Sequence, residues 1–428
     1  MRATDKMPLG RKMAVIRKEL KFTQATLSAA VGYCSSTIGN YEKERCEVSR
    51  QILAAFKKAL EIEDVPLTDA EVVAFKKELY SWNDTINFGD MKKAIELQPK
   101  MARCVKLSYD EDLQVLFDLF SINYNYRMRR MNECGRIIDS LREREYGFTD
   151  EYRYWYYRYQ GVVTHCTWRY KEAVELYLKA EEIGDCYNLN DNAFYFNIGN
   201  CFTCMGYFIL AIEYIDKVQL KEFSTANVNY WFSVQALLAD NYCKLGKTDK
   251  AFNILEKYHE YLVTEKKDDE LRLGMLYHNF GRVYHEVENF EKALENYDKA
   301  SRNYDKKSEI YLKYLCDKSL LLRSNNKNNG VMDCLDEGMP LVVEGTLWYE
   351  WLHAIDHSLN LNQQDSLLYI QFTAIPKFHE YGKHTLAMEC YKWLSNHCKK
   401  KGTHKPAGEY SEKAMEIYQK LVKGDLSL

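Results

Sequence analysis

The strongest constraint on the fold is a pattern of small and aromatic residues that recurs roughly every 40 residues. Alanines stand at 173, 211, 251 and 293, with spacings of 38, 40 and 42 residues. Each follows an aromatic and a small residue placed at helical spacing. Small residues let two helices approach closely, and aromatic rings fill the gap to the next pair. The pattern predicts a stack of helix pairs in which each pair packs only against its neighbours.

The copies of this pattern resemble the tetratricopeptide repeat. The clearest copy contains Tyr277, Phe280, Gly281, Tyr284, Ala293, Tyr297 and Ala300, and a later copy uses Phe378, Gly382, Ala387 and Tyr391. Residues 110–145 and 310–345 are expected to be helix pairs that lack the signature, with a polar loop at Asn325–Gly330. Gly408–Lys423 is expected to form the capping helix of the stack. The predicted fold is all-α, with a right-handed solenoid in the body of the chain.

Composition agrees with long helices and argues against a membrane protein. The 428 residues include only 6 prolines and 20 glycines, and no apolar run approaches the ~20 residues that a membrane span needs. The 13 cysteines are odd in number and scattered, and Met1–Gly10 lacks the apolar core of a signal peptide. We expect reduced thiols and a cytoplasmic protein.

Charge is unevenly distributed along the chain. Residues 1–60 hold 12 Lys and Arg against 5 Asp and Glu, a net of +7, whereas the whole chain carries −3. A basic end on an acidic body indicates that the N-terminal segment meets a polyanion.

The basic segment predicts four short helices with a tight turn between the second and the third. Thr23 is expected to cap a helix over Gln24–Val31, which Gly32 ends. The next segment, Cys34–Glu42, is short and rich in small polar side chains, so it is slim enough for a DNA major groove. Flanking helices are expected from Leu9 and after a cap at Ser49.

The stretch RKELKFTQATLSAAVGYCSSTIGNYEKERCEVSRQILAAFKKALEI resembles the lambda-repressor-like (Xre) helix-turn-helix family almost position by position. Gly39 departs from the longer side chain common at its position, which puts one base contact in doubt. An alternative is that the basic surface is merely solvated and that Ser35 only caps its helix. The resemblance implies DNA contacts by Gln24, Ser35, Ser36, Thr37 and Asn40, with Arg17, Lys43 and Arg45 at phosphates.

A less regular segment joins this head to the repeats. Thr68 is expected to cap a helix that runs through Leu79, and residues 82–107 predict two or three short helices because Gly89 and Pro99 interrupt the pattern. The predicted domains are a DNA-binding head at 1–63, connecting helices at 64–108, and a repeat domain for peptide sensing and dimerisation at 109–428.

The order of head and repeats resembles the peptide-pheromone receptors of the Rap, Rgg, NprR, PlcR and PrgX group (RRNPP family), most of all the NprR branch. The resemblance implies a cytoplasmic quorum-sensing transcriptional regulator. It would bind operator DNA through the head and a short signalling peptide in the concave groove of the repeats. Since one such head reads only a half-site, a homodimer is expected.

A bound extended peptide needs side chains that both donate and accept hydrogen bonds, and Asn does this best. Counting from the repeat aromatics predicts a ladder in the groove, in which Arg158 or Arg282 pairs with a terminal carboxylate. The alternative is that these residues are solvated or bond between helices. The predicted peptide-binding residues are Arg158, Asn197, Asn200, Asp240, Asn279 and Arg282.

No pattern indicates catalysis, a cofactor or a metal. Cys201 and Cys204 form a CxxC without a second pair at zinc-site spacing, and His353 and His357 lack the Glu of a metalloprotease motif. We therefore expect no enzyme. Two other functions stay open: a Rap-like adaptor that binds a response-regulator protein through residues 68–107, and a plain scaffold that binds a protein tail.

Overall fold

The computed structural model describes residues 7–87, 90–218, 228–264 and 269–427. These residues form helices and connecting turns, with no β-strand among them, which confirms the all-α prediction. The chain divides into two compact units. Unit 1 comprises residues 1–163 and 179–189, and unit 2 comprises residues 164–178 and 190–428.

The head folds as its sequence predicts. The Thr23 hydroxyl accepts from the Thr26 amide at 3.0 Å, the Thr26 hydroxyl returns a bond to the Thr23 amide, and Gly32 ends the helix at a φ of 75°. Ser49 caps the fourth helix by accepting from the Ile52 amide. The helices are α1 (Leu9–Glu19), α2 (Gln24–Val31), α3 (Ser35–Glu42) and α4 (Arg50–Ala59).

The connecting segment contradicts the prediction of several short helices. Thr68 caps its helix as expected, but that helix continues past Leu79, because Leu79, Trp82 and Ile86 extend one fully buried stripe. Residues 91–108 then form one helix with Pro99 inside it. The predicted break at Gly89 lies outside the described residues. The helices are α5 (Asp69–Asn87), α6 (Met91–Ser108), α7 (Glu111–Arg127), α8 (Met131–Arg142), a 3₁₀ turn (Glu145–Gly147), α9 (Asp150–Cys166) and α10 (Tyr170–Tyr187).

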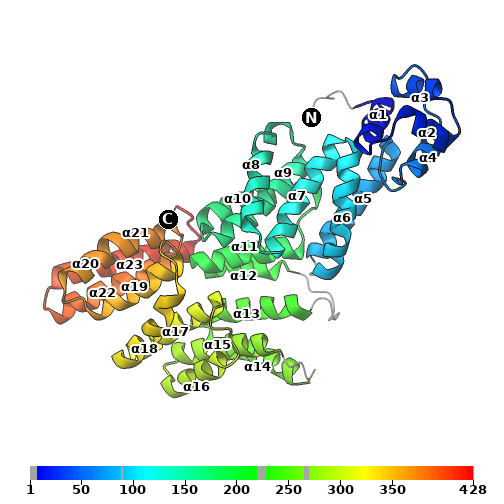
Figure 1. The fold of residues 1–428 in the computed structure, drawn as a ribbon. Coiled ribbons are helices and arrows are strands. Elements are labelled where there is room, and N and C mark those ends of the chain that lie inside the picture. The colour runs from blue at the N-terminus through cyan, green and yellow to red at the C-terminus, as the bar shows by residue number, and fades with distance from the viewer. Residues whose placement is uncertain (1–6, 88–89, 219–227, 265–268, 428) are drawn as a thin grey trace. The chain divides into compact units, whose positions relative to one another are not determined.

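Unit 2 is a series of antiparallel helix pairs that pack side by side, as α13 to α16 show in Figure 1. The predicted polar loop is shorter than expected because a helix already begins at Asn328. The helices are α11 (Asn192–Met205), α12 (Phe208–Asp216), α13 (Val228–Lys244), α14 (Thr248–Thr264), α15 (Glu270–Glu286), α16 (Phe290–Ser301), α17 (Glu309–Ser324), α18 (Asn328–Gly338), a 3₁₀ turn (Met339–Leu341), α19 (Leu347–Leu359), α20 (Gln364–Tyr369), a π-helical turn (Ile370–Ala374), α21 (Ile375–Glu380), α22 (His384–Lys400) and α23 (His404–Lys423).

The repeat positions pack as the pattern requires. Ala211, Ala251 and Ala293 are fully buried. A Cβ at Gly281 would lie 2.7 Å from the Tyr297 ring, so α15 and α16 approach at a distance that only glycine permits there. The capping helix predicted at Gly408–Lys423 is present as α23.

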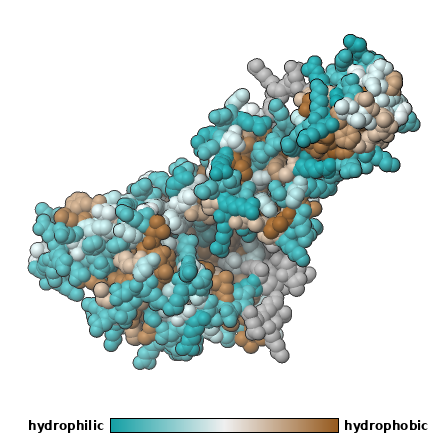
Figure 2. Space-filling view, viewed as in Figure 1, coloured by the Kyte–Doolittle hydropathy of each residue, from teal (hydrophilic) through white to brown (hydrophobic). Residues whose placement is uncertain are grey.

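The described helices include none that is both long and apolar enough to span a membrane. Figure 2 shows a surface that is hydrophilic over most of the visible face.

Candidate DNA-binding and peptide-binding sites

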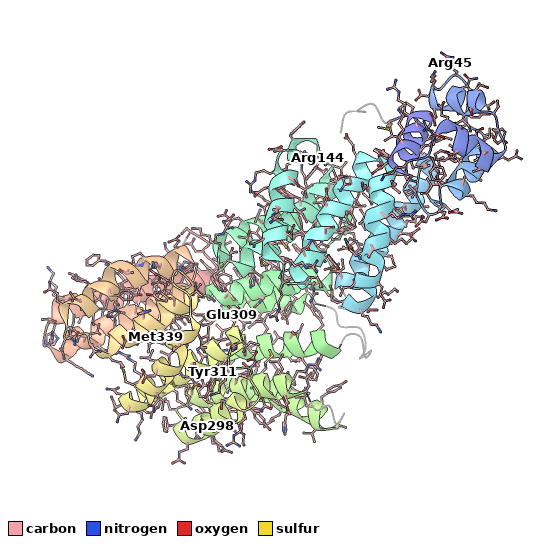
Figure 3. All side chains as sticks on the ribbon, viewed as in Figure 1. Arg45, Arg144, Asp298, Glu309, Tyr311 and Met339 are labelled. Carbon is pink, nitrogen blue, oxygen red and sulfur yellow. The ribbon has the colours of Figure 1, made fainter. Side chains whose placement is uncertain are left out.

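Helix α3, which the sequence predicts to be the recognition helix, presents small polar side chains at its surface. Ser36 is exposed, and Ser35, Thr37 and Asn40 are half-buried. Lys43 and Arg45 are exposed in the segment between α3 and α4, where Figure 3 labels Arg45. Neither cation forms an ion pair within the described part of the chain. These six residues form a surface that is polar and basic, as DNA contact requires.

Arg17 is not where the sequence predicts it. Its side chain is 6% exposed, and its Nε and Nη2 lie 2.5 and 2.9 Å from the two carboxylate oxygens of Glu42. Burial alone would raise the pKa of Glu42, but hydrogen bonds from Arg17 and Gln24 lower it. Arg17 therefore joins α1 to α3 and is not free for a phosphate. The prediction for Arg17 is wrong because the Glu42 carboxylate on the facing helix α3 binds it. Helical spacing within α1 does not reveal a partner on another helix.

Gln24 is also tied to Glu42. Its Nε2 donates to Glu42 Oε2 at 2.8 Å, and the side chain stays half-buried. The Glu42 carboxylate thus binds both Arg17, predicted to contact a phosphate, and Gln24, predicted to contact a base.

Cys34 precedes α3 and bonds two of the predicted DNA-binding hydroxyls. Its Sγ lies 3.1 Å from Ser36 Oγ and 2.8 Å from Thr37 Oγ1. These hydrogen bonds, with Ser36 the larger contribution, lower the pKa of the exposed thiol to about 7. The two hydroxyls are therefore held in place at the start of the recognition helix.

Unit 2 contains a cavity of about 590 Å³. Its walls come from α11, α12, α13, α15, α16, α17, α19, α22 and α23, with Trp348, Trp351 and Trp393 among its apolar residues. Glu309, labelled in Figure 3, accepts from the Trp348 indole at 2.7 Å and so links the start of α17 to α19. The volume lies in the usual range of ligand sites, roughly 300–1,000 Å³.

A charge network joins three helices of the cavity wall, α13, α15 and α17. Arg282 Nη2 on α15 lies 2.6 Å from Asp240 Oδ1 on α13, and its Nε lies 3.4 Å from Asp317 Oδ2 on α17. Burial opposes ionisation of Asp317, but the charge of Arg282 keeps the pKa of this carboxyl well below its usual range. Asp317 also accepts from His278 at 3.0 Å, although burial lowers the pKa of that imidazole. Arg282 is therefore already neutralised by two carboxylates.

The structure brings only part of the predicted peptide ladder together. Asp240 and Arg282 line the cavity, whereas Asn197, Asn200 and Asn279 are half-buried outside its lining.

Arg158 belongs to unit 1 and is 1% exposed. Its guanidinium carbon lies 5.2 Å from the Trp155 ring centroid, and Nη1 donates to the Tyr154 hydroxyl at 2.9 Å. Arg158 is therefore buried among aromatic side chains of unit 1. This position differs from the predicted one in an open peptide groove.

Sequence reasoning missed the contribution of α17 and α22 to the cavity. Lys313 and Asp317 lie one turn apart on α17, and Lys383 directly precedes α22. Residues 310–345 lack the repeat signature, so counting from repeat aromatics could not reach them. The spacing of the two α17 residues, i and i+4, was the available signal.

The histidines and cysteines that sequence analysis set aside take part in packing. His357 Nδ1 lies 3.0 Å from Ser366 Oγ, and His165 Nδ1 lies 2.9 Å from Cys201 Sγ. Over the described residues, no group of three or more His, Cys, Asp and Glu side chains is arranged to hold a metal ion.

Comparison with known proteins identifies the repeat and its relatives. Residues 232–306 match the model of the tetratricopeptide repeat. The chain is 22% identical over 258 residues to the transcriptional activator NprA of Geobacillus stearothermophilus, across 58% of this chain. The match spans about 60% of that relative's length.

Two solved structures share the fold over most of the chain. One is NprR in complex with its cognate peptide NprX, with a TM-score of 0.69 and 14% identity over 80% of this chain and 99% of that one. The other is a Rap protein complexed with competence and sporulation factor, with a TM-score of 0.66 and 14% identity over 82% of this chain and 99% of that one.

These proteins are a transcriptional activator, NprR bound to its cognate peptide, and a Rap protein. The chain contains a tetratricopeptide repeat, is similar in sequence to the transcriptional activator NprA, and shares its fold with NprR and a Rap protein.

Proposed function

We propose that this chain is a peptide-responsive transcriptional regulator. It binds operator DNA through α3 and the residues after it, and a short signalling peptide in the cavity of unit 2. The observation that carries the proposal is the cavity itself, which has the volume of a ligand site and combines tryptophans with a charge network across three helices. A peptide, with its apolar side chains and polar backbone, matches such a lining.

The head supplies the second half of the proposal. Six predicted DNA-binding residues are exposed or half-buried at α3 and after it, and the N-terminal segment is basic. NprA, to which the chain is similar, is a transcriptional activator, and NprR binds its cognate peptide. We propose that the protein works as a homodimer in the cytoplasm, because two heads read two half-sites.

A Rap-like adaptor is the second candidate function. It is supported by the likeness to a Rap protein over 82% of the chain.

The test is capture of fragmented genomic DNA by the full-length protein at about physiological salt, with and without a pool of random short peptides. The control is the double variant Lys43→Met/Arg45→Met. We expect enrichment of a few palindromic sites by the native chain only, with a yield that changes when peptides are added. Equal capture of all sequences by both proteins, or no capture under either condition, would reject DNA regulation and favour the adaptor.

A further inference from the structure

The cavity of unit 2 carries more positive than negative charge. Its lining includes the cations Lys244, Arg282, Lys313, Arg323, Lys383 and Lys392 against the acids Asp240, Glu286, Asp317 and Glu389. That is six cations against four carboxylates, so the lining favours a ligand with negative charge.

Four of the six cations, Lys244, Lys313, Arg323 and Lys383, have no carboxylate of their own within the described residues. Asp240 and Asp317 are bound to Arg282, and Glu389 lies 3.5 Å from Lys392. Lys313 and Lys383 form no ion pair within the described residues. Lys383 instead places its ammonium 4.3 Å from the ring centroid of Tyr170. Arg323 donates to the Ser358 carbonyl and lies 4.5 Å from the Trp393 ring centroid. The positive excess therefore lies among these four cations, and Lys313 and Lys383 are two of them.

Burial makes the charge of Lys313 costly. Burial and the nearby charge of Arg282 lower the pKa of this ammonium, and the more distant aspartates do not compensate. Lys313 is half-buried, and an ammonium in such a place without a close counter-ion is stabilised when an anion binds beside it.

Cys204 also lines the cavity, and positive charges near it lower the pKa of its thiol. Burial would raise the pKa of its thiol, but the charge of Lys383, a hydrogen bond and the charge of His165, and the charge of Lys313 lower it to about 6. A field that favours a thiolate also favours a carboxylate. Both lysines line the same cavity as this thiol, and the charge of each lowers its pKa.

We infer that Lys313 and Lys383 form an anion subsite in the cavity, and that it binds a carboxylate of the peptide ligand. The inference rests on the proposed peptide binding and specifies that the peptide must carry a carboxylate. The carboxylate is either the C-terminus or an acidic side chain of the peptide, since both present the same group. The subsite replaces Arg282 as the partner of that carboxylate, because Arg282 is already held by two aspartates.

The experiment measures retention of random heptapeptides by the full-length protein, with mass spectrometry of what is bound. Four pools are used: with free C-terminal carboxylates or C-terminal amides, and with or without Asp and Glu in the sequence. We expect retention from every pool that carries a carboxylate and at least about tenfold less from the neutral amide pool. The pool that is retained best identifies the source of the carboxylate.

Variants test the two lysines directly. Lys313→Met and Lys383→Met are each expected to lower retention at least about tenfold, and Lys313→Arg is expected to keep it. The matched control is Lys318→Met, on the same helix as Lys313, whose ammonium lies outside the cavity lining and 2.9 Å from Asp298, labelled in Figure 3. Thermal melting of each variant reports whether it is folded.

The four peptide pools, tested on the native protein, distinguish failure of the anion subsite from failure of the proposed peptide binding. Equal retention of the neutral amide pool overturns the anion subsite and leaves peptide binding intact. No retention from any pool overturns the proposed peptide binding, and the subsite with it.

Discussion

Arg17 on α1 and Glu42 on α3 form a buried ion pair, with Arg17 Nε 2.5 Å from Glu42 Oε1 and both side chains less than 10% exposed. Arg17 also donates to the carbonyl of Phe22 at 2.7 Å. The pair fixes the recognition helix against the first helix of the head. The geometry of the candidate DNA-binding surface thus depends on two residues that do not belong to it.

Removing one member of this pair should loosen the head. Arg17→Met leaves the Glu42 carboxylate buried without its partner, which typically costs about 3–5 kcal/mol. We expect faster hydrogen exchange of the amides in α1 and α3, measured by mass spectrometry on the full-length protein. Arg11→Met is the control, because its ion pair with Glu44 is exposed at 3.7 Å and should contribute less than about 1 kcal/mol. Equal exchange in the two variants would show that the buried pair is not structural.

Lys43 and Arg45 should set part of the salt dependence of DNA binding. Both are exposed and lack a partner in the described chain, so each is available to displace one counter-ion from a phosphate. Each substitution by Met is expected to reduce the slope of log affinity against log salt by about 0.9. Fluorescence anisotropy with duplex DNA over a salt series measures it. A slope that stays the same in both variants would remove them from the DNA surface, and Lys401→Met, an exposed lysine of unit 2, serves as the control.

Gly281→Ala should destabilise unit 2. The added methyl would lie 2.7 Å from Cδ1 of Tyr297, whose ring is fully buried, so α15 and α16 must move apart. Overpacking of this kind costs about 1–3 kcal/mol and should lower the melting temperature. Gly408→Ala on α23 meets no heavy atom within 4 Å and should be neutral or stabilising by up to about 1 kcal/mol. A melting temperature that rises in both variants would contradict the close packing of the repeat.

Stability should increase with pH in the acid range because of His384. Its side chain is fully buried, its Nδ1 lies 3.2 Å from His379 Nδ1, and burial lowers its pKa from 6.5 to about 4. Between these values the unfolded chain binds a proton that the folded chain does not, so protons favour unfolding. The contribution is present above pH 6.5 and lost as pH falls to about 4, and amounts to at most about 3 kcal/mol.

Melting temperatures from about pH 4 to 7 test this dependence. His384→Leu should flatten the curve, since leucine binds no proton in either state. His404→Gln, at an exposed histidine that begins α23, is the control and should leave the curve unchanged. A native curve that is flat in this range would contradict the buried neutral state of His384.

Local features of the fold could be predicted because they depend on neighbours in the sequence. The caps at Thr23, Ser49 and Thr68 need only a hydroxyl and an amide two or three residues away. The repeat alanines identify helix pairs because the same steric demand recurs in each copy. The prediction for the connecting segment was wrong because it depended on packing. Gly and Pro predicted breaks in this segment. The buried stripe of Leu79, Trp82 and Ile86 instead keeps α5 helical, because packing outweighs intrinsic propensity.

The sequence by itself determined the all-α class, the helix-turn-helix elements and the repeat, because period, caps and small residues are short-range properties of the chain. Only the tertiary structure decided which charged groups are free. Arg17 and Arg282 look available on their own helices, yet carboxylates from α3, α13 and α17 neutralise them. Lys313 and Lys383 are among the cavity cations that form no ion pair within the described residues. Charge pairing acts through space between residues distant in sequence, so helical spacing alone does not disclose it.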